Sequence, residues 1–201
     1  MNNTIIIPVN YDDKNYSVDI VSERFLKRRI IYLCGEINDA MAQNIIAQLQ
    51  YLEERAPDLE IYLYINSPGG DVYSGSAIVD AMNACKCDIV TVGTGLVASM
   101  GAFILSCGKK GKRFVSPLCE VMIHQPLGGV QGQASDIRLV AEHIAKIKKR
   151  LNKILSKNTN QPLEKIEVDS DRDHWMDARE TVSYGLADEI GTPDFDHDIW
   201  R

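Results

Sequence analysis

Residues 61–84 read IYLYINSPGGDVYSGSAIVDAMNA, and the order of residue types in this stretch decides the fold. The apolar run Ile61–Ile65 predicts a buried strand, and the mixed apolar segment 72–84 predicts a helix. Between them Asn66-Ser-Pro-Gly-Gly70 is typical of a tight turn. A strand, a turn and a helix in this order are the first parts of a βαβ unit.

The same alternation extends in both directions along the chain. Helices of about 10 to 15 residues between strands indicate right-handed crossovers and a largely parallel sheet. The sequence therefore predicts an α/β fold built from βαβ units. The further strands are expected at 30–34, 89–92 and 121–123, and the further helices at about 39–54, from near residue 99, and at about 162–168 and 178–184.

A long amphipathic helix is predicted over residues 133–157, after the glycine-rich segment 128–134. Its apolar side chains recur at steps of three and four residues, and the opposite face is charged. At 1.5 Å per residue the helix is about 35 Å long, so we expect it to project from a small domain. Packing on its own core and contact with another subunit both remain possible readings of the apolar stripe, which consists of Ile137, Val140, Ile144, Ile147, Leu151 and Ile154.

Length and composition describe an ordinary globular protein. The 201 residues suit one domain over 29–201, preceded by a polar, irregular arm over 1–28 whose segment 10–15 is expected to be a loop. A net charge of -6 argues against nucleic-acid binding. No apolar run reaches the roughly 20 residues of a membrane span, and none resembles a signal-peptide core, so a cytoplasmic location is expected.

Cofactors and metals are not expected from the sequence. Five cysteines without C-x-x-C spacing are typical of reduced, structural thiols, and this reading is favoured over a metal or redox site at Cys85-Lys-Cys87. The four histidines have no ligand spacing, so no metal is predicted. The chain lacks a G-x-x-x-x-G-K-[ST] loop and should not bind ATP itself.

Ser99, His124 and Asp173 are the residue types that nucleophilic acyl transfer requires. A serine hydroxyl is a weak nucleophile, which needs a histidine base and a carboxylate that orients the histidine. Taken singly, Ser99 could be a helix cap, His124 a core residue and Asp173 a solvated acid. Their joint position at strand ends and helix starts, where α/β sites gather, favours a catalytic triad.

An oxyanion hole is predicted beside the serine. The paired glycines of 66–70 allow a backbone N–H to face a ligand directly, because no Cβ stands in the way. The N–H of Met100, which follows the nucleophile at a helix start, should point into the same space.

Six segments of the chain carry a resemblance to a known family, namely 65–70, 98–102, 112–114, 122–129, 131–134 and 171–173. On these segments, from about Asp19 to Asp188, the chain resembles the proteolytic subunits of the Clp protease family (ClpP). The segment Met122-Ile-His-Gln-Pro126 distinguishes it from the related crotonases and serine-lysine signal-peptide peptidases.

This resemblance implies a serine endopeptidase of the ClpP/crotonase-like spiral fold, which cleaves unfolded polypeptides through an acyl-enzyme. Ser99 would be the nucleophile, His124 the base and then the acid, and Asp173 the orienting carboxylate, with the oxyanion held by the N–H groups of Gly70 and Met100. Substrate would lie as an added strand beside 70–72 and 126–128, with Gly70, Val72 and Leu127 as binding residues.

The resemblance also implies an assembly of two stacked heptameric rings, with the region 125–157 as the handle that joins them. Asp171 and Arg172 would pair across the rings, and an AAA+ ATPase would use ATP to unfold and deliver substrates. The ATPase would dock in a pocket made of Tyr62, Tyr64, Val92 and Phe114.

The departures from the family pattern fall on the partner-binding parts. The arm before Asp19 is shorter than usual, and Ala84, Thr94 and Ser116 are smaller or more polar than the residues expected around the docking pocket. A homo-oligomer and a hetero-oligomer therefore both remain open. The alternatives are a regulatory ring subunit that is active only in a mixed assembly, and an acyl-CoA enzyme of the crotonase type.

Overall fold

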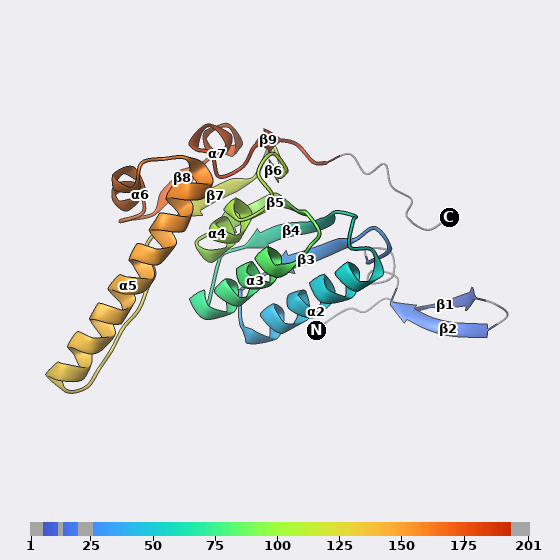
Figure 1. Ribbon diagram of the computed structural model, residues 1–201, viewed down its shortest axis with the longest axis horizontal. Helices are drawn as coiled ribbons and strands as arrows, with labels where there is room; N and C mark the ends of the chain where they lie inside the picture. The colour runs from blue at the N-terminus through green and yellow to red at the C-terminus, as the bar shows by residue number, and fades with distance from the viewer. Residues whose placement is uncertain (1–5, 12–13, 20–25, 194–201) are drawn as a thin grey trace.

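The computed structural model describes residues 6–11, 14–19 and 26–193, and its centre is a seven-stranded sheet (Figure 1). The strands pair in the order β3-β4-β5-β6-β9. In addition, β7 pairs with the second half of β5, and β8 pairs with β7. These strands are β3 (Ile30–Cys34), β4 (Ile61–Ser67), β5 (Ile89–Ala98), β6 (Arg113–Val115), β7 (Glu120–Ile123), β8 (His174–Met176) and β9 (Glu189–Ile190).

Every pair in this sheet is parallel except β7 with β8. Because helices connect the parallel strands, the predicted α/β class with a largely parallel sheet is confirmed. The helices are α2 (Asp39–Arg55), α3 (Val72–Ala84), α4 (Met100–Ser106), α5 (Ala134–Thr159), α6 (Leu163–Asp169) and α7 (Ala178–Tyr184).

Both faces of the central strands are apolar, as expected for a parallel sheet. On one face, β3 and β4 bury Leu33 and Leu63 in the main core with the inner sides of α2 and α3, which run side by side in Figure 1. The opposite face carries a separate cluster, in which Tyr64 and Phe114 pack against fully enclosed neighbours. We call this second group the aromatic cluster, and its buried members are Ile30, Tyr62, Val90 and Val92.

Helix α5 is the long helix expected from the apolar stripe, and it extends away from the rest of the molecule in Figure 1. Its second half is anchored, since Ile147, Leu151 and Leu155 are buried in the main core. Its first half is covered only in part, and Ile137 and Leu139 are 41% and 59% exposed. The apolar stripe therefore packs in the core of this chain in the second half of α5, and it leaves apolar surface exposed in the first half.

The expectation of an irregular segment over 1–28 is wrong for part of its length. Strands β1 (Ile6–Tyr11) and β2 (Lys14–Asp19) form an antiparallel pair in which Ile7 is opposite Val18. The alternation of apolar with other residues in both segments is a strand signal, which the polar composition of the region obscured. Whether residues 1–28 form a separate arm stays a prediction, because 1–5, 12–13 and 20–25 lie outside the described residues.

The other strands also differ from expectation in length or number. Strand β5 continues past the predicted end at Val92 to Ala98, although Gly93 and Gly95 are weak strand formers. The short strands β6, β8 and β9 were not expected at all, because strands of two or three residues carry no recognisable periodicity.

The carboxyl end of the chain is tied to the core through a buried ion pair. Arg113 on β6 is buried and donates to Asp188 from Nε at 2.8 Å and from Nη2 at 2.5 Å. Its Nη1 also donates to the carbonyls of Ser106 and Asn158, at the ends of α4 and α5. Burial alone would raise the pKa of Asp188, but the hydrogen bonds and charge of Arg113 hold that pKa below its usual range.

We expect Asp188→Asn to lower the free energy of unfolding by about 3 kcal/mol at neutral pH, because it leaves the buried Arg113 charge without its partner. The folded-state pKa of Asp188 lies below the unfolded value, so its contribution is present above the unfolded pKa and is lost as pH falls through the folded one. Urea denaturation should therefore show a larger difference from the unmodified chain at pH 7 than at pH 3. Asp58→Asn, at an exposed position, is the control, and equal midpoints for both variants would contradict the prediction.

Within the part of the chain that the structure describes, none of the helices has the length and apolar character that crossing a bilayer requires.

Candidate active site

Three of the predicted site segments meet at one edge of the sheet. The turn after β4, Ser99 after β5 and His124 after β7 all follow the carboxyl ends of mutually parallel strands. Such ends lie together at a single edge, which is the usual place for sites in α/β proteins. Strand β8 runs antiparallel to β7, with His174 opposite Ile123, so Asp173 just before β8 arrives at the same edge.

Ser99 occupies the sharp junction between β5 and α4. Its φ of 55° is a left-handed conformation that a non-glycine residue rarely adopts. The junction is fixed from both sides, because Ser99 N–H donates to the Met122 carbonyl at 2.8 Å and Phe103 N–H donates back to the Ser99 carbonyl. Although Ser99 precedes the helix, its side chain makes no capping hydrogen bond. The structure thus does not support the reading of Ser99 as a helix cap.

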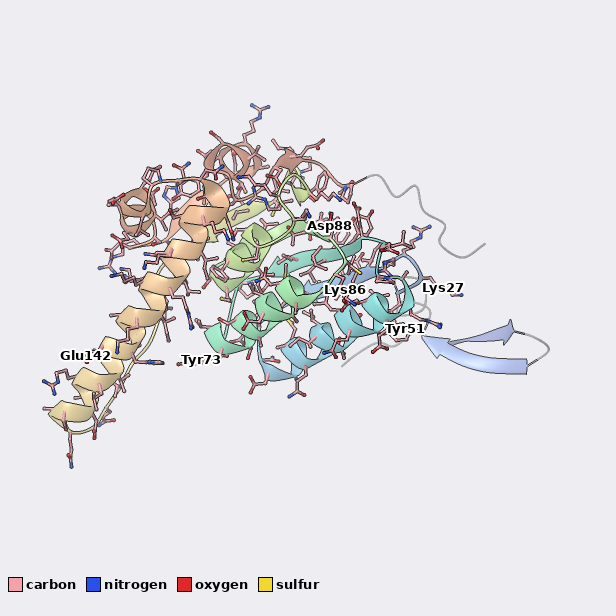
Figure 2. All side chains as sticks on the ribbon, viewed as in Figure 1. Lys27, Tyr51, Tyr73, Lys86, Asp88 and Glu142 are labelled. Carbon is pink, nitrogen blue, oxygen red and sulfur yellow. The ribbon has the colours of Figure 1, made fainter. Side chains whose placement is uncertain are left out.

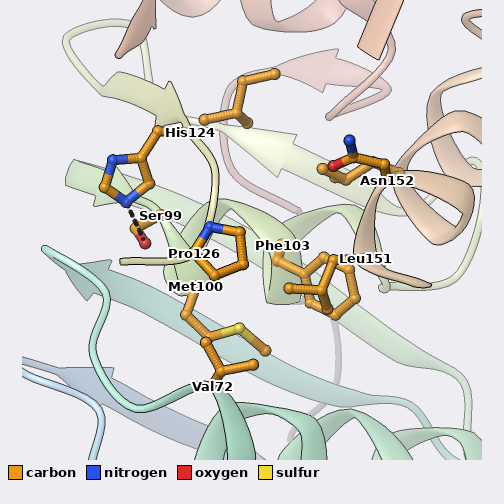
Figure 3. Close-up of a pocket in the computed structure, with 10 residues that line it drawn as sticks. Val72, Ser99, Met100, Phe103, His124, Pro126, Leu151 and Asn152 are labelled. Atoms are coloured by element: carbon orange, nitrogen blue, oxygen red, sulfur yellow. Dashed lines mark hydrogen bonds between the residues drawn. The ribbon is translucent and has the colours of Figure 1, made fainter. Parts of the chain in front are cut away.

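The serine hydroxyl is instead directed at His124 (Figure 3). Ser99 Oγ lies 2.8 Å from Nε2 of the imidazole, and the other ring nitrogen, Nδ1, lies 3.0 Å from Oδ1 of Asp173. The His124 side chain is 15% exposed, whereas that of Asp173 is 59% exposed. A carboxylate at Nδ1 selects the tautomer with its proton on that nitrogen, which leaves Nε2 free to accept the serine proton.

Two consecutive glycines shape the turn opposite the serine. A Cβ on Gly69, whose φ is 98°, would lie 2.6 Å from Ser99 Cβ and 3.1 Å from the Met100 nitrogen. A Cβ on Gly70 would lie 2.3 Å from the Ile37 carbonyl oxygen, across the bridge that joins this turn to the segment after β3. Glycine is therefore required at both positions for the backbones to come this close.

The N–H groups of Gly70 and Met100 are available at this turn. Neither donates to a protein acceptor among the described residues, whereas the neighbouring Gly69 N–H donates to Ser67 Oγ and Asp71 N–H donates to the Ile37 carbonyl. The proximity of Gly69 to the Met100 nitrogen shows that the turn faces the start of α4. Reasoning from the sequence named Gly70 and Met100, but it missed the closer packing of Gly69 against the serine.

An apolar pocket opens beside Ser99 and His124 (Figure 3). Val72 lines it, as expected for a substrate-binding residue, whereas Gly70 and Leu127 do not. Pro126 belongs to the segment 126–128 that was expected beside the substrate. The helical side chains of the lining were not predicted, because apolar residues within helices look like ordinary core residues in a sequence. The additional lining residues are Met100, Phe103, Ile123, Pro126, Leu151, Asn152 and Leu155.

Leu127 lies in the extended segment between His124 and α5, and it is 84% exposed. A Cβ on the next residue, Gly128, would lie 2.6 Å from Ile144 Cδ1, so this segment packs closely against α5. The pair formed by 126–128 and 70–72 is therefore open to solvent in the single chain, as a site for an added strand requires.

A hydrogen-bonded group connects α5 to the segments that carry His124 and Asp173. Lys148 Nζ donates to Gln125 Oε1 at 2.8 Å and lies 3.2 Å from Asp171 Oδ1. Gln125 Nε2 donates to the Asp171 carbonyl at 2.7 Å. Lys148 was not expected here, because one lysine among several on α5 gives no signal in the sequence. Pairing of Asp171 with Arg172 across rings stays a prediction.

The four residues predicted for ATPase docking come together in the aromatic cluster on the far face of the sheet. Tyr62 donates from Oη to Glu60 at 2.9 Å, and burial together with this carboxylate raises the pKa of Tyr62 to about 12. The ring of Tyr64 lies 5.4 Å from that of Tyr32, which is 43% exposed. Tyr62 and Val92 are buried, Tyr64 and Phe114 are half-buried, and Tyr32 is the exposed ring beside them, so docking of another protein at this cluster stays a prediction.

No group of three or more histidine, cysteine, aspartate or glutamate side chains within the described ranges is arranged to hold a metal ion.

Comparison with protein families adds an independent finding to this geometry. The family model described as Clp protease matches residues 12–194, which is most of the chain and includes every residue of the site.

Proposed function

We propose, from the premise that the chain belongs to the Clp protease family, that it is a serine endopeptidase and the proteolytic subunit of an ATP-dependent chambered protease. The observation that carries this proposal is the continuous hydrogen-bonded series from Ser99 Oγ through His124 to Asp173. An apolar pocket and two available N–H groups beside the hydroxyl complete the parts that acyl transfer requires.

In the proposed mechanism, Ser99 Oγ attacks the carbonyl carbon of a peptide bond while its proton passes to His124 Nε2. Asp173 stabilises the imidazolium through Nδ1–H, and the N–H groups of Gly70 and Met100 donate to the oxyanion. His124 then gives the proton to the departing amine, which breaks the C–N bond and leaves an acyl-serine. Water, deprotonated by His124, attacks this ester and releases the second product.

The pocket lining indicates the preferred side chain before the cleaved bond. Phe103, Leu151 and Leu155 present apolar atoms, while Asn152 is the one polar side chain among the residues that line the pocket away from Ser99 and His124. Burying a methylene there gains about 1 kcal/mol, whereas a carboxylate would lose its hydration without a charged partner. Leucine and methionine should therefore be favoured.

We expect kcat/KM to be about 100-fold higher for a fluorogenic peptide with leucine before the cleaved bond than for the same peptide with aspartate. The alanine peptide should fall between them, because it fills the pocket only in part. A series in which aspartate is cleaved as fast as leucine would show that this pocket does not receive the side chain.

Assembly into two stacked heptameric rings is proposed from the resemblance, with α5 in the role of the handle. The uncovered apolar side chains in the first half of α5 support a contact with another subunit. Enclosure in a chamber has a physical rationale, since a strand-like substrate site with one apolar pocket discriminates poorly between polypeptides.

An AAA+ ATPase is the proposed partner, docking at the aromatic cluster and using ATP outside this chain. No cofactor or metal is needed by the proposed chemistry, because each proton transfer is assigned to a side chain. Whether the small residues Ala84, Thr94 and Ser116 weaken this docking decides between a homo-oligomer and a mixed assembly.

The second candidate function is a ring subunit that is active only in a mixed assembly. The observation that supports it is the 59% exposure of the Asp173 side chain. An exposed carboxylate is strongly screened by solvent, so its interaction with His124 would strengthen if another subunit covered it. The aligned geometry of the single chain favours the first candidate over this one.

The test is cleavage of short peptides by the purified chain, with particle size recorded on the same sample. Labelling by a serine-directed fluorophosphonate should occur at Ser99, which excludes an acyl-CoA enzyme of the crotonase type. Cleavage by a particle of many subunits supports the self-sufficient protease. A chain that is labelled but cleaves only after a second subunit is added supports the mixed assembly, and absence of labelling in both states contradicts the proposal.

A further inference from the structure

Two cysteines outside the active site lie two residues apart and line the same surface cleft. Cys85 and Cys87 occupy the connection between α3 and β5, separated by Lys86. Cys87 lies near enough to influence the pKa of the Cys85 thiol. Cys85 is partly exposed and Cys87 is buried. Reasoning from the sequence favoured structural thiols, because the chain offers no second ligand pair with recognisable spacing.

A buried cation faces the inner sulfur. Arg29 is 3% exposed, and its Nη2 lies 3.3 Å from Cys87 Sγ. The other recorded acceptors of this guanidinium, among the described residues, are main-chain carbonyl oxygens, namely those of Leu52, Ala56, Leu59 and Glu60. A buried charge is stabilised by a counter-charge, and a cation beside a thiol favours the thiolate. Cys87 thus has a buried cation beside its sulfur, and its thiol donates to the Ala56 carbonyl at 3.6 Å.

The pair borders a surface cleft of about 440 Å³, whose lining residues include both cysteines together with Lys86, Lys109 and Lys110. Figure 2 shows Lys86 and Asp88 on this side of the molecule. Asp88 lies in the same lining and pairs with Lys109 at 2.7 Å. The cleft has the volume of a small-molecule site, and its lysines favour an anionic molecule.

We propose that Cys85 and Cys87 form a redox-active dithiol that exchanges with a small anionic disulfide bound in this cleft. Cys85 attacks one sulfur of the disulfide R–S–S–R, its proton leaves with the displaced R–SH, and a mixed disulfide forms. Cys87 then attacks the Cys85 sulfur, displaces the second R–SH and closes the Cys85–Cys87 bond. Two thiols of the protein are oxidised, and one external disulfide is reduced to two thiols.

The positions of the two sulfurs fit these roles. The partly exposed Cys85 is the one that an external molecule can reach, and the buried Cys87, two residues away beside Arg29, is placed to act in the second step. Burial raises the pKa of Cys85 to about 11, and the Cys87 sulfur beside it contributes to the increase. The first step should therefore be slow at neutral pH and accelerate as pH rises.

The test treats the full-length chain with oxidised glutathione at pH 9 and then digests it with trypsin under non-reducing conditions. Trypsin cleaves after Lys86, so the two cysteines fall on neighbouring peptides that stay joined only by a disulfide. We expect joined peptides from the unmodified chain and none from Cys85→Ser or Cys87→Ser. Cys87→Ser should instead carry a glutathionyl group on Cys85, at a level at least about tenfold above the unmodified chain, because the neighbouring thiol is missing.

Exposed Cys34 reports in every sample that the reagent is active, and circular dichroism checks that each variant is folded. Three results would overturn the proposal. The joined peptides could persist in Cys87→Ser, which would mean that Cys85 is bonded to Cys107, the other cysteine on the tryptic peptide that contains position 87. The unmodified chain could hold a stable mixed disulfide on Cys85, or Cys34 could react while Cys85 and Cys87 stay reduced.

Discussion

Ser99→Ala is expected to lower kcat for peptide cleavage by about 10⁴- to 10⁶-fold. The hydroxyl is the only group at the strained junction between β5 and α4 that reaches His124, at 2.8 Å from Nε2. Removing it leaves the pocket and the N–H groups of the glycine turn in place, so substrate binding should change little. The measurement is the rate of fluorogenic peptide cleavage under conditions that saturate the enzyme.

The control is Ser183→Ala, at an exposed position on α7, which should keep full activity. Particle size by light scattering must be the same for both variants, because loss of assembly would lower activity by another route. If Ser99→Ala in a particle of unchanged size keeps more than about a hundredth of the activity, the assignment of the nucleophile is wrong.

The sequence predicted the parts of this structure that have strong local signals. The turn Asn66–Gly70 has a strand on one side and helix α3 over Val72–Ala84 on the other, as expected. One turn-forming cluster lies between two segments whose apolar residues have different spacing, so few other assignments of secondary structure fit this stretch. Strands β1 and β2 were missed because polar composition outweighed a short alternation.

The candidate site also has residues that the sequence predicted and residues that it did not. Ser99, His124 and Asp173 were named because serine, histidine and aspartate each have a required chemical role, and the structure places them in hydrogen-bonding order. Phe103 and Leu155 line the pocket, but on a helix they are indistinguishable from core residues until the helices are packed. Residue type therefore predicts the chemistry of the site, whereas its shape depends on long-range packing.

Asp173→Asn is expected to lower kcat by about 10⁴-fold, although aspartate and asparagine have nearly the same shape. The amide can donate from its nitrogen to Nδ1 of His124, which stabilises the tautomer with the proton on Nε2. That nitrogen lies 2.8 Å from Ser99 Oγ and could then no longer accept the serine proton. The loss should appear in kcat and leave KM nearly unchanged, because Asp173 is absent from the pocket lining.

This variant separates hydrogen-bond direction from charge. Asp173 is 59% exposed, so solvent screens its charge, and a purely electrostatic role would give a much smaller loss that depends on salt. Asp80→Asn, which removes one exposed charge from α3, controls for net charge and should be fully active. A loss of less than about tenfold for Asp173→Asn at both low and high salt would mean that another group orients His124, and the triad would then have to be reassigned.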